Sequence, residues 1–243
     1  MASIYTYYRA CLAGSGGAQL VLSLVAPISG TPRGTARGAP PRAGTEGRPY
    51  TCTGQEEGFV KAAYLDIETS YLGQLRYPEL CRDYKNHKIT VIGVRIMEDE
   101  KDAFVQLIEK ETTRELLMTV LKGIDRLVTY NGRSIPDTVK GHVGFDFPVI
   151  AAQLGVVLDR QFPHVDLCPE CWKAGLWGGQ KAVEQTLGLK RTLPGKDGAW
   201  ADQTWKQYEA SQDRRYLNEL LAYNKEDVYM LRRIEEALAR RKM

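Results

Sequence analysis

A short apolar segment that ends in two carboxylates reads Ala62-Ala63-Tyr64-Leu65-Asp66-Ile67-Glu68-Thr69. We predict a β-strand here. Side chains in a strand alternate between its faces, so Asp66 and Glu68 should share one face. Two adjacent acids repel each other, whereas a divalent cation would turn this repulsion into a binding site, because hard cations prefer carboxylate oxygens. A D-x-E triplet is common by chance, so a metal site here depends on ligands from elsewhere in the chain.

The composition is that of a soluble globular protein, with 43% hydrophobic and 26% charged residues in a chain of 243. This length fits one sizeable domain or two small ones. The net charge of +3 permits a nucleic-acid partner without arguing for one. Five cysteines without framework spacing favour a reducing compartment, and no apolar run reaches about 18 residues. We therefore expect a cytoplasmic protein without a membrane span.

Residues 1–58 differ from the rest, being rich in Gly, Ala, Pro, Ser and Thr, with Glu46 as their first acid. An acid-poor leader is typical of a transit peptide, and the apolar run Leu20 to Ile28 is typical of a signal peptide, but neither match is good. We expect a disordered extension, or a start codon placed too far upstream. The globular domain would then cover residues 59–243.

The remaining pattern alternates strands and helices. Beyond the strand at 61–68 we predict strands at 89–96, 103–108, 125–130 and 164–167. The strands at 89–96 and 103–108 would form a hairpin, and the strand at 164–167 would lead into a helix. We predict helices at 112–122, with Thr112 or Thr113 as N-cap, and at 145–154, 180–189, 199–210 and 212–241. This order predicts an α/β fold, a mixed five-stranded sheet flanked by helices.

A polar connection, Ser70 to Lys88, interleaves aromatic residues with cations. Such a segment suits a single strand of nucleic acid through stacking and phosphate contacts. A solvated loop explains the same residues equally well.

Two further motifs have structural explanations. Asp146, in Phe145-Asp146-Phe147-Pro148, can cap the helix that begins there, because aspartate is a favoured N-cap and proline is tolerated in the first turn. Cys168 and Cys171 form a single C-x-x-C, which is half a zinc site, and no second pair accompanies it. Packing of both cysteines as small apolar side chains is the favoured interpretation.

Asp227 does not fit the helix that contains it. At 100° per residue it falls within the apolar stripe of Leu220, Leu231, Ile234 and Leu238. A buried, unpaired carboxylate costs several kcal/mol, so Asp227 needs a cation or strong donors. An ion pair with an arginine and a bound metal are equally good explanations at this point. Tyr223 lies one turn earlier on the same side.

Asp66, Glu68, Asp146 and Asp227 can converge at the carboxyl end of the first strand, with Tyr223 beside them. Four carboxylates would neutralise two divalent cations. Two ions about 4 Å apart stabilise both the attacking and the leaving oxygen of a phosphoryl displacement. A tyrosine hydroxyl can orient the attacking water.

The order of the motifs resembles that of the DEDDy-type 3′–5′ exonucleases, and most of all the YprB-type ribonuclease-H-like domain, a distant relative of the proofreading domain of family B polymerases. The resemblance covers residues 61–240 and rests on Leu65-Asp66-Ile67-Glu68-Thr69, Tyr130-Asn131-Gly132, Phe145-Asp146-Phe147-Pro148 and Tyr223-Asn224-Lys225-Glu226-Asp227-Val228.

This resemblance implies a ribonuclease-H-like fold and metal-dependent 3′–5′ hydrolysis of DNA or RNA, at a single-stranded 3′ end. It implies two Mg²⁺ or Mn²⁺ ions, with Asp66 bridging both. Glu68 and Asp227 would hold the ion that bears the nucleophilic water, and Asp146 the second ion. Tyr223 would position the water. The candidate substrate-binding residues are Thr69, Asn131 and Lys140.

One departure from the family pattern is an insertion, Arg133 to Gly144, between Tyr130-Asn131-Gly132 and Phe145-Asp146. It could contact substrate, or it could displace Asp146. Displacement would favour a competing function, a nucleic-acid-binding module of the same fold that lacks turnover. A zinc or redox protein built on Cys168 and Cys171 is a third alternative.

Overall fold

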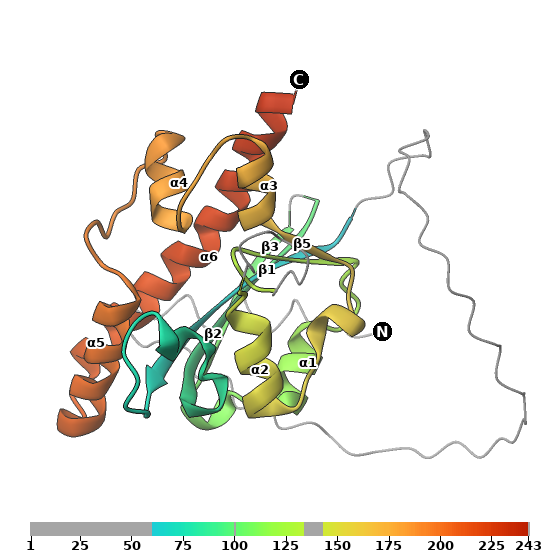
Figure 1. Cartoon of the computed structure of the whole chain (residues 1–243). Helices are drawn as coiled ribbons and strands as arrows, with labels where there is room; N and C mark the ends of the chain where they lie inside the picture. Colours follow the sequence, from blue (N-terminus) through green and yellow to red (C-terminus); the bar gives the residue numbers. More distant parts are fainter. Residues whose placement is uncertain (1–59, 100, 134–142, 243) are drawn as a thin grey trace, which may run out of the picture. The chain divides into compact units, whose positions relative to one another are not determined.

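The computed structural model describes residues 60–99, 101–133 and 143–242 (Figure 1). The predictions made for residues 1–58 lie outside this range. The greater part of the insertion, including Lys140, also lies outside the described residues.

The predicted mixed sheet is confirmed, with five strands in the order β3-β2-β1-β4-β5. The strands are β1 (Ala62–Tyr71), β2 (His87–Glu98), β3 (Lys101–Ile108), β4 (Arg126–Thr129) and β5 (His164–Asp166). β1, β2 and β3 are antiparallel neighbours, as the predicted hairpin requires, whereas β4 and β5 run parallel to β1. β1 is therefore the central strand, and it extends further than predicted, to Tyr71.

The helices match the predicted set, with shifts at their ends. They are α1 (Arg114–Val120), α2 (Asp146–Leu154), α3 (Leu167–Lys173), α4 (Gln180–Thr186), α5 (Gly198–Ser211) and α6 (Arg214–Lys242). Thr113 is the N-cap of α1, and its hydroxyl accepts a hydrogen bond from the Leu116 amide at 3.2 Å. In the polar connection, two short 3₁₀ helices, Glu79–Arg82 and Tyr84–Asn86, separate β1 from β2.

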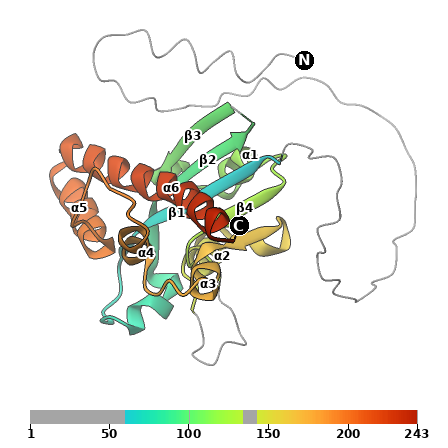
Figure 2. The same cartoon turned by 90° about the horizontal axis from the view of Figure 1, so that it is seen from above.

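Helices cover both faces of the sheet, and the alternation of β1 decides which residues meet which helices. Ala63, Leu65 and Ile67 pack in one core cluster with residues of α1 and α2. Ala62 and Tyr64 pack in a second cluster, with residues of α3 and α6. In Figures 1 and 2, α6 crosses the sheet and α5 lies beside its amino-terminal half. Asp66 and Glu68 continue the series of Ala62 and Tyr64, so they face α6.

Within the part of the chain that the structure describes, no helix combines the length and apolar character needed to cross a membrane.

Candidate metal centre

Three carboxylates meet between β1 and α6. Glu68 and Asp227 are buried and Asp66 is half-buried, and one oxygen from each lies within 4.8 Å of the other two. Asp66 and Glu68 meet because the strand places them on one face. Asp227 joins them because it lies on the side of α6 that packs against the sheet. Oxygen donors of this kind suit hard divalent cations such as Mg²⁺ and Mn²⁺.

Burial and mutual repulsion act together on these acids. Burial raises the pKa of Asp66 and of Glu68 well above the usual range, and the charge of Asp227 raises both further. Burial also raises the pKa of Asp227, although two cations oppose that shift. The site therefore favours proton uptake in the absence of a metal, and a divalent cation would take the place of those protons.

Asp146 is the first residue of α2, and Phe145 takes the N-cap position without a side-chain hydrogen bond. The predicted capping role of Asp146 is therefore wrong, because its side chain is one residue too far along to cap this helix. The carboxylate is buried, and within the described part of the chain its Oδ2 atom has no hydrogen-bond partner. Burial and then the charge of Asp66 raise the pKa of Asp146. A bare carboxylate oxygen that interacts electrostatically with Asp66 fits a further metal ligand.

The two ends of the insertion are tied together by backbone hydrogen bonds. The Phe145 amide donates to the Asn131 carbonyl at 2.8 Å, and the Phe147 amide donates to the Gly132 carbonyl at 2.9 Å. The turn after β4 thus holds the start of α2 despite the added residues. Asp146 stays near enough for the charge of Asp66 to raise its pKa, but it is not among the three carboxylates that meet within 4.8 Å.

Asp166 fixes that turn from the end of β5. Its Oδ1 atom accepts the amide of Asn131 at 2.8 Å and the amide of Cys168 at 3.0 Å, and its Oδ2 atom accepts the amide of Arg133 at 3.0 Å. Asn131 has a left-handed backbone, with φ of 62°. The buried carboxylate of Asp166 thus holds two backbone amides of the turn, those of Asn131 and Arg133. The sequence signal for Asp166 was its place before the helix that begins at Leu167, where an aspartate can serve as N-cap.

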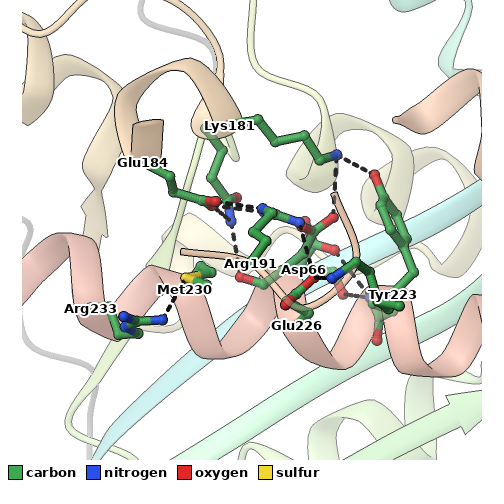
Figure 3. A network of polar contacts seen from close by, with 12 residues as sticks. Asp66, Lys181, Glu184, Arg191, Tyr223, Glu226, Met230 and Arg233 are labelled. Carbon is green, nitrogen blue, oxygen red and sulfur yellow. Dashed lines mark hydrogen bonds and ion pairs between the residues drawn. The ribbon is translucent and has the colours of Figure 1, made fainter. Parts of the chain in front are cut away.

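Tyr223 is buried beside the carboxylates. Lys181, from α4, donates a hydrogen bond to its hydroxyl at 2.5 Å (Figure 3). Burial raises the pKa of Tyr223, and the charges of Glu68, Asp227 and Asp66 raise it further. The phenol therefore stays protonated at neutral pH and can donate or accept hydrogen bonds without serving as a base.

Two cations that the sequence did not reveal oppose the negative charge. Arg191 lies 2.5 Å from Oδ1 of Asp227 and holds Glu184 through two nitrogens, at 2.5 and 2.7 Å (Figure 3). Lys181 lies 3.8 Å from Oδ2 of Asp227. The ion-pair explanation of Asp227 is therefore confirmed, and it coexists with the grouping of acids. Glu184 is only 1% exposed, so its carboxylate needs the cation that Arg191 supplies, and no pattern in the sequence indicated this pair.

Asn224 supports the acids from α6. Its amide nitrogen donates to Oδ2 of Asp66 at 3.1 Å, while its amide oxygen accepts from Gln106 at 3.0 Å. Gly93 lies opposite Asp66 on β2, and a Cβ atom there would come within 2.2 Å of the Asn224 oxygen. A glycine at this position is what lets Asn224 reach the strand.

Thr69, a predicted substrate-binding residue, has its hydroxyl 3.0 Å from Nδ1 of His87. Nε2 of His87 lies 2.9 Å from the Leu80 carbonyl and must donate to it, so Nδ1 accepts from Thr69. Thr69 thereby anchors the polar connection to β1. Its role toward substrate stays a prediction, as do those of Asn131 and Lys140.

Cys168 and Cys171 are free thiols buried in the core cluster beneath α6, as the apolar interpretation predicted. Burial raises the pKa of Cys168 to about 12 and that of Cys171 to about 11, which disfavours the thiolates that bind zinc. Among the described residues, the one cluster with metal-ligating geometry is the acidic one on β1 and α6.

Comparison with known families agrees with this geometry. The model of the RNase H superfamily matches residues 63–239, which include all the acids of the site and the whole sheet except Ala62. The chain belongs to the RNase H superfamily. A search of curated proteins gave no significant match. Membership of the RNase H superfamily indicates a nuclease that acts on nucleic acid with the help of divalent metal ions, and the grouped acids are residues that could hold such ions.

Proposed function

We propose that this RNase H-like domain, residues 59–243, is a DEDDy-type 3′–5′ exonuclease that removes nucleotides from a single-stranded end of DNA or RNA with two Mg²⁺ or Mn²⁺ ions. The observation that carries the proposal is the approach of Asp66, Glu68 and Asp227 to within 4.8 Å of one another. Asp146 adds a buried oxygen without a hydrogen-bond partner among the described residues.

The chain supplies ligands, orientation and charge. Asp66, Glu68, Asp146 and Asp227 would hold the ions, which would provide Lewis-acid chemistry to the phosphate and the attacking water. Asn224 keeps the Asp66 carboxylate in place through the 3.1 Å hydrogen bond to Oδ2. A carboxylate so fixed loses little freedom when it takes up a ligand.

Tyr223 would orient the attacking water. Its raised pKa keeps the hydroxyl protonated, so it acts through hydrogen bonds and not as a general base. Lys181 donates to this hydroxyl, and the hydroxyl in turn has a hydrogen bond to Asp227, one of the proposed metal ligands. Lys181 also places a positive charge beside the site, where the phosphate of a bound strand would lie.

A second candidate is a nucleic-acid-binding module of the same fold without turnover. It is favoured by the cations already in contact with proposed catalytic groups, Arg191 with Asp227 and Lys181 with Tyr223. In that case the acids and cations form a charge-balanced structural network, and no metal displaces them.

Degradation of a 5′-labelled single strand tests the proposal. Wild-type protein with Mn²⁺ should produce a ladder of successively shorter labelled products, on DNA or RNA, and Asp66→Asn should produce none. Glu235→Gln is the matched control, since it neutralises another half-buried acid of the α6 face outside the site. Equal activity in wild type and Asp66→Asn, or internal cleavage, would contradict the proposal. Binding of the strand without any cleavage would support the second candidate.

A further inference from the structure

A hollow of about 370 Å³ lies beside the metal centre, and its walls include Tyr130, Asn131, Trp172, Gly178, Gly179 and Gln180. A second hollow, of about 240 Å³, is lined by Gly179, Gln180, Lys181, Ala182 and Asp227. Gly179 and Gln180 line both. The larger hollow, which we call the side pocket, therefore adjoins the hollow in front of Asp227.

Two tryptophans form an aromatic surface at the side pocket. Trp172, on the pocket wall, stacks with Trp177, with ring centroids 6.1 Å apart and ring planes 20° apart. Trp177 is 69% exposed, which is unusual for the largest side chain in proteins. An exposed aromatic surface beside a cavity marks a place where a ligand or partner can bind.

The backbone next to Trp177 is held in place and carries no side chains. The Tyr130 hydroxyl donates to the Gly178 carbonyl at 2.7 Å. Gly178 has φ of 109°, which only glycine adopts without strain. Gly179 has ordinary dihedral angles, and a Cβ atom built on it would meet nothing within 4 Å. The glycine pair thus places no side chain where the side pocket adjoins the hollow in front of Asp227.

We propose that the side pocket is a nucleobase subsite, in which the Trp172–Trp177 surface stacks an unpaired base of the strand whose end is hydrolysed at the carboxylates. The inference rests on the proposed function for the identity of the ligand. Stacking on an aromatic ring suits every base, because each has a π-face, and it requires a base that is not already stacked within a duplex. The subsite therefore selects single strands without selecting a sequence.

The smaller hollow, in front of Asp227, suits the phosphate that would follow the stacked base along the strand. Lys181 lines it and lies 3.8 Å from Asp227, so it can pair with a phosphate that approaches the acids. The tryptophan surface at one end and the lysine at the other give a base site and a phosphate site in sequence. This arrangement fits a nucleotide chain better than an apolar peptide, which would have no partner for the charges.

Binding of a fluorescently labelled single strand in EDTA tests the subsite without requiring hydrolysis. Trp177→Leu, which removes the ring but keeps apolar volume, should raise Kd and KM about tenfold with kcat unchanged. Trp177→Phe, which keeps a ring, should bind within about twofold of wild type. Both changes are at an exposed side chain, so both proteins should fold. Equal Kd for wild type and Trp177→Leu would overturn the proposal.

Strands with one abasic position locate the stacked base. Moving the abasic position inward from the 3′ end should weaken binding to wild type at one position, in DNA and in RNA. The same strand should bind Trp177→Leu no more weakly than an intact one. A loss that persists unchanged in Trp177→Leu would place the stacked base elsewhere and overturn the subsite.

The two proposals fail separately. If wild type binds strands through Trp177 but hydrolyses none, the exonuclease proposal falls and the subsite stands. If wild type hydrolyses strands, Asp66→Asn does not, and Trp177→Leu is unchanged in Kd and KM, the subsite falls and the exonuclease proposal stands.

Discussion

Helix α6 makes two charged contacts with the sheet, at Glu235 and at Asp227, and these two places differ in the balance of acids and cations. At Glu235, one carboxylate accepts hydrogen bonds from Tyr64 at 2.6 Å and from Arg126, at 3.1 Å for one of its nitrogens. At Asp227, two turns earlier, one carboxylate shares its surroundings with Asp66 and Glu68 as well as with cations. In both places a carboxylate of α6 lies against residues of β1.

The difference separates an ion pair that stabilises the fold from a site that binds something. At Glu235 the donors match the acceptor, so nothing further is required. At Asp227 the carboxylates outnumber the cations around them, burial raises the pKa of each acid, and Asp146 contributes a further bare oxygen. An arrangement that costs folding energy in this way is expected where function requires it.

The largest contrast should appear in catalysis. Asp66→Asn should lower the rate of strand hydrolysis about a thousandfold, because it removes several kcal/mol of metal-assisted stabilisation of the transition state. Glu235→Gln should leave the rate within about twofold, since its side chain is remote from the acids. Single-turnover assays on both variants measure this. A large loss in Glu235→Gln would show that the two places are not separate.

Metal binding should stabilise the protein through the acidic cluster at Asp227 and not through Glu235. At a Mn²⁺ concentration of 100 times Kd, the free energy of unfolding of wild type should rise by about 2.7 kcal/mol. Glu235→Gln should show the same gain, and Asp66→Asn little or none, because one carboxylate of the cluster is gone. Urea unfolding with and without Mn²⁺ gives the values. An equal gain in all three proteins would place the metal outside the cluster.

Metal-free stability should depend on pH through the acids of the site. Their pKa values are raised on folding, so above about pH 4, where the unfolded chain has released its protons, the folded protein still holds some. Raising the pH through this window therefore lowers the free energy of unfolding, by about 1.4 kcal/mol per pH unit for each proton retained. Asp66→Asn should flatten the slope measured in EDTA, while Glu235→Gln should not. Parallel slopes would mean that the acids are not coupled as described.

The smallest effect should be on the fold itself. Glu235→Gln should lower the free energy of unfolding by roughly 1 to 2 kcal/mol, because it weakens charge-assisted hydrogen bonds at a half-buried position. Asp66→Asn should instead leave the metal-free protein as stable as wild type or more so at neutral pH, since it relieves repulsion. Thermal unfolding in EDTA compares them. A gain of stability in Glu235→Gln would reverse the roles assigned to the two places.

The sequence was sufficient for the fold and for the acids that local geometry places. Strand alternation put Asp66 and Glu68 on one face, and the helical stripe put Asp227 and Tyr223 toward the sheet. Both are short-range regularities that depend on a few neighbouring residues. The five-stranded sheet followed from the same patterns.

Long-range partners could not be obtained in this way. Arg191 follows α4 and meets Asp227 through a contact that no local pattern encodes. The position of Asp146 depends on hydrogen bonds from Phe145 and Phe147 to the turn after β4. These bonds join the two ends of the insertion, and no local sequence pattern predicts them. The capping role expected of Asp146 was wrong by one residue, which is within the usual error of predicted helix ends.

The central claim is that the acids on β1, α2 and α6 bind divalent metal ions. Anomalous diffraction from crystals of the full chain soaked in Mn²⁺ tests it most directly. We predict two anomalous peaks among Asp66, Glu68, Asp146 and Asp227, which disappear or weaken in Asp66→Asn and persist in Glu235→Gln. No peak at these carboxylates in wild type, with Arg191 and Lys181 still paired to Asp227, would contradict the account.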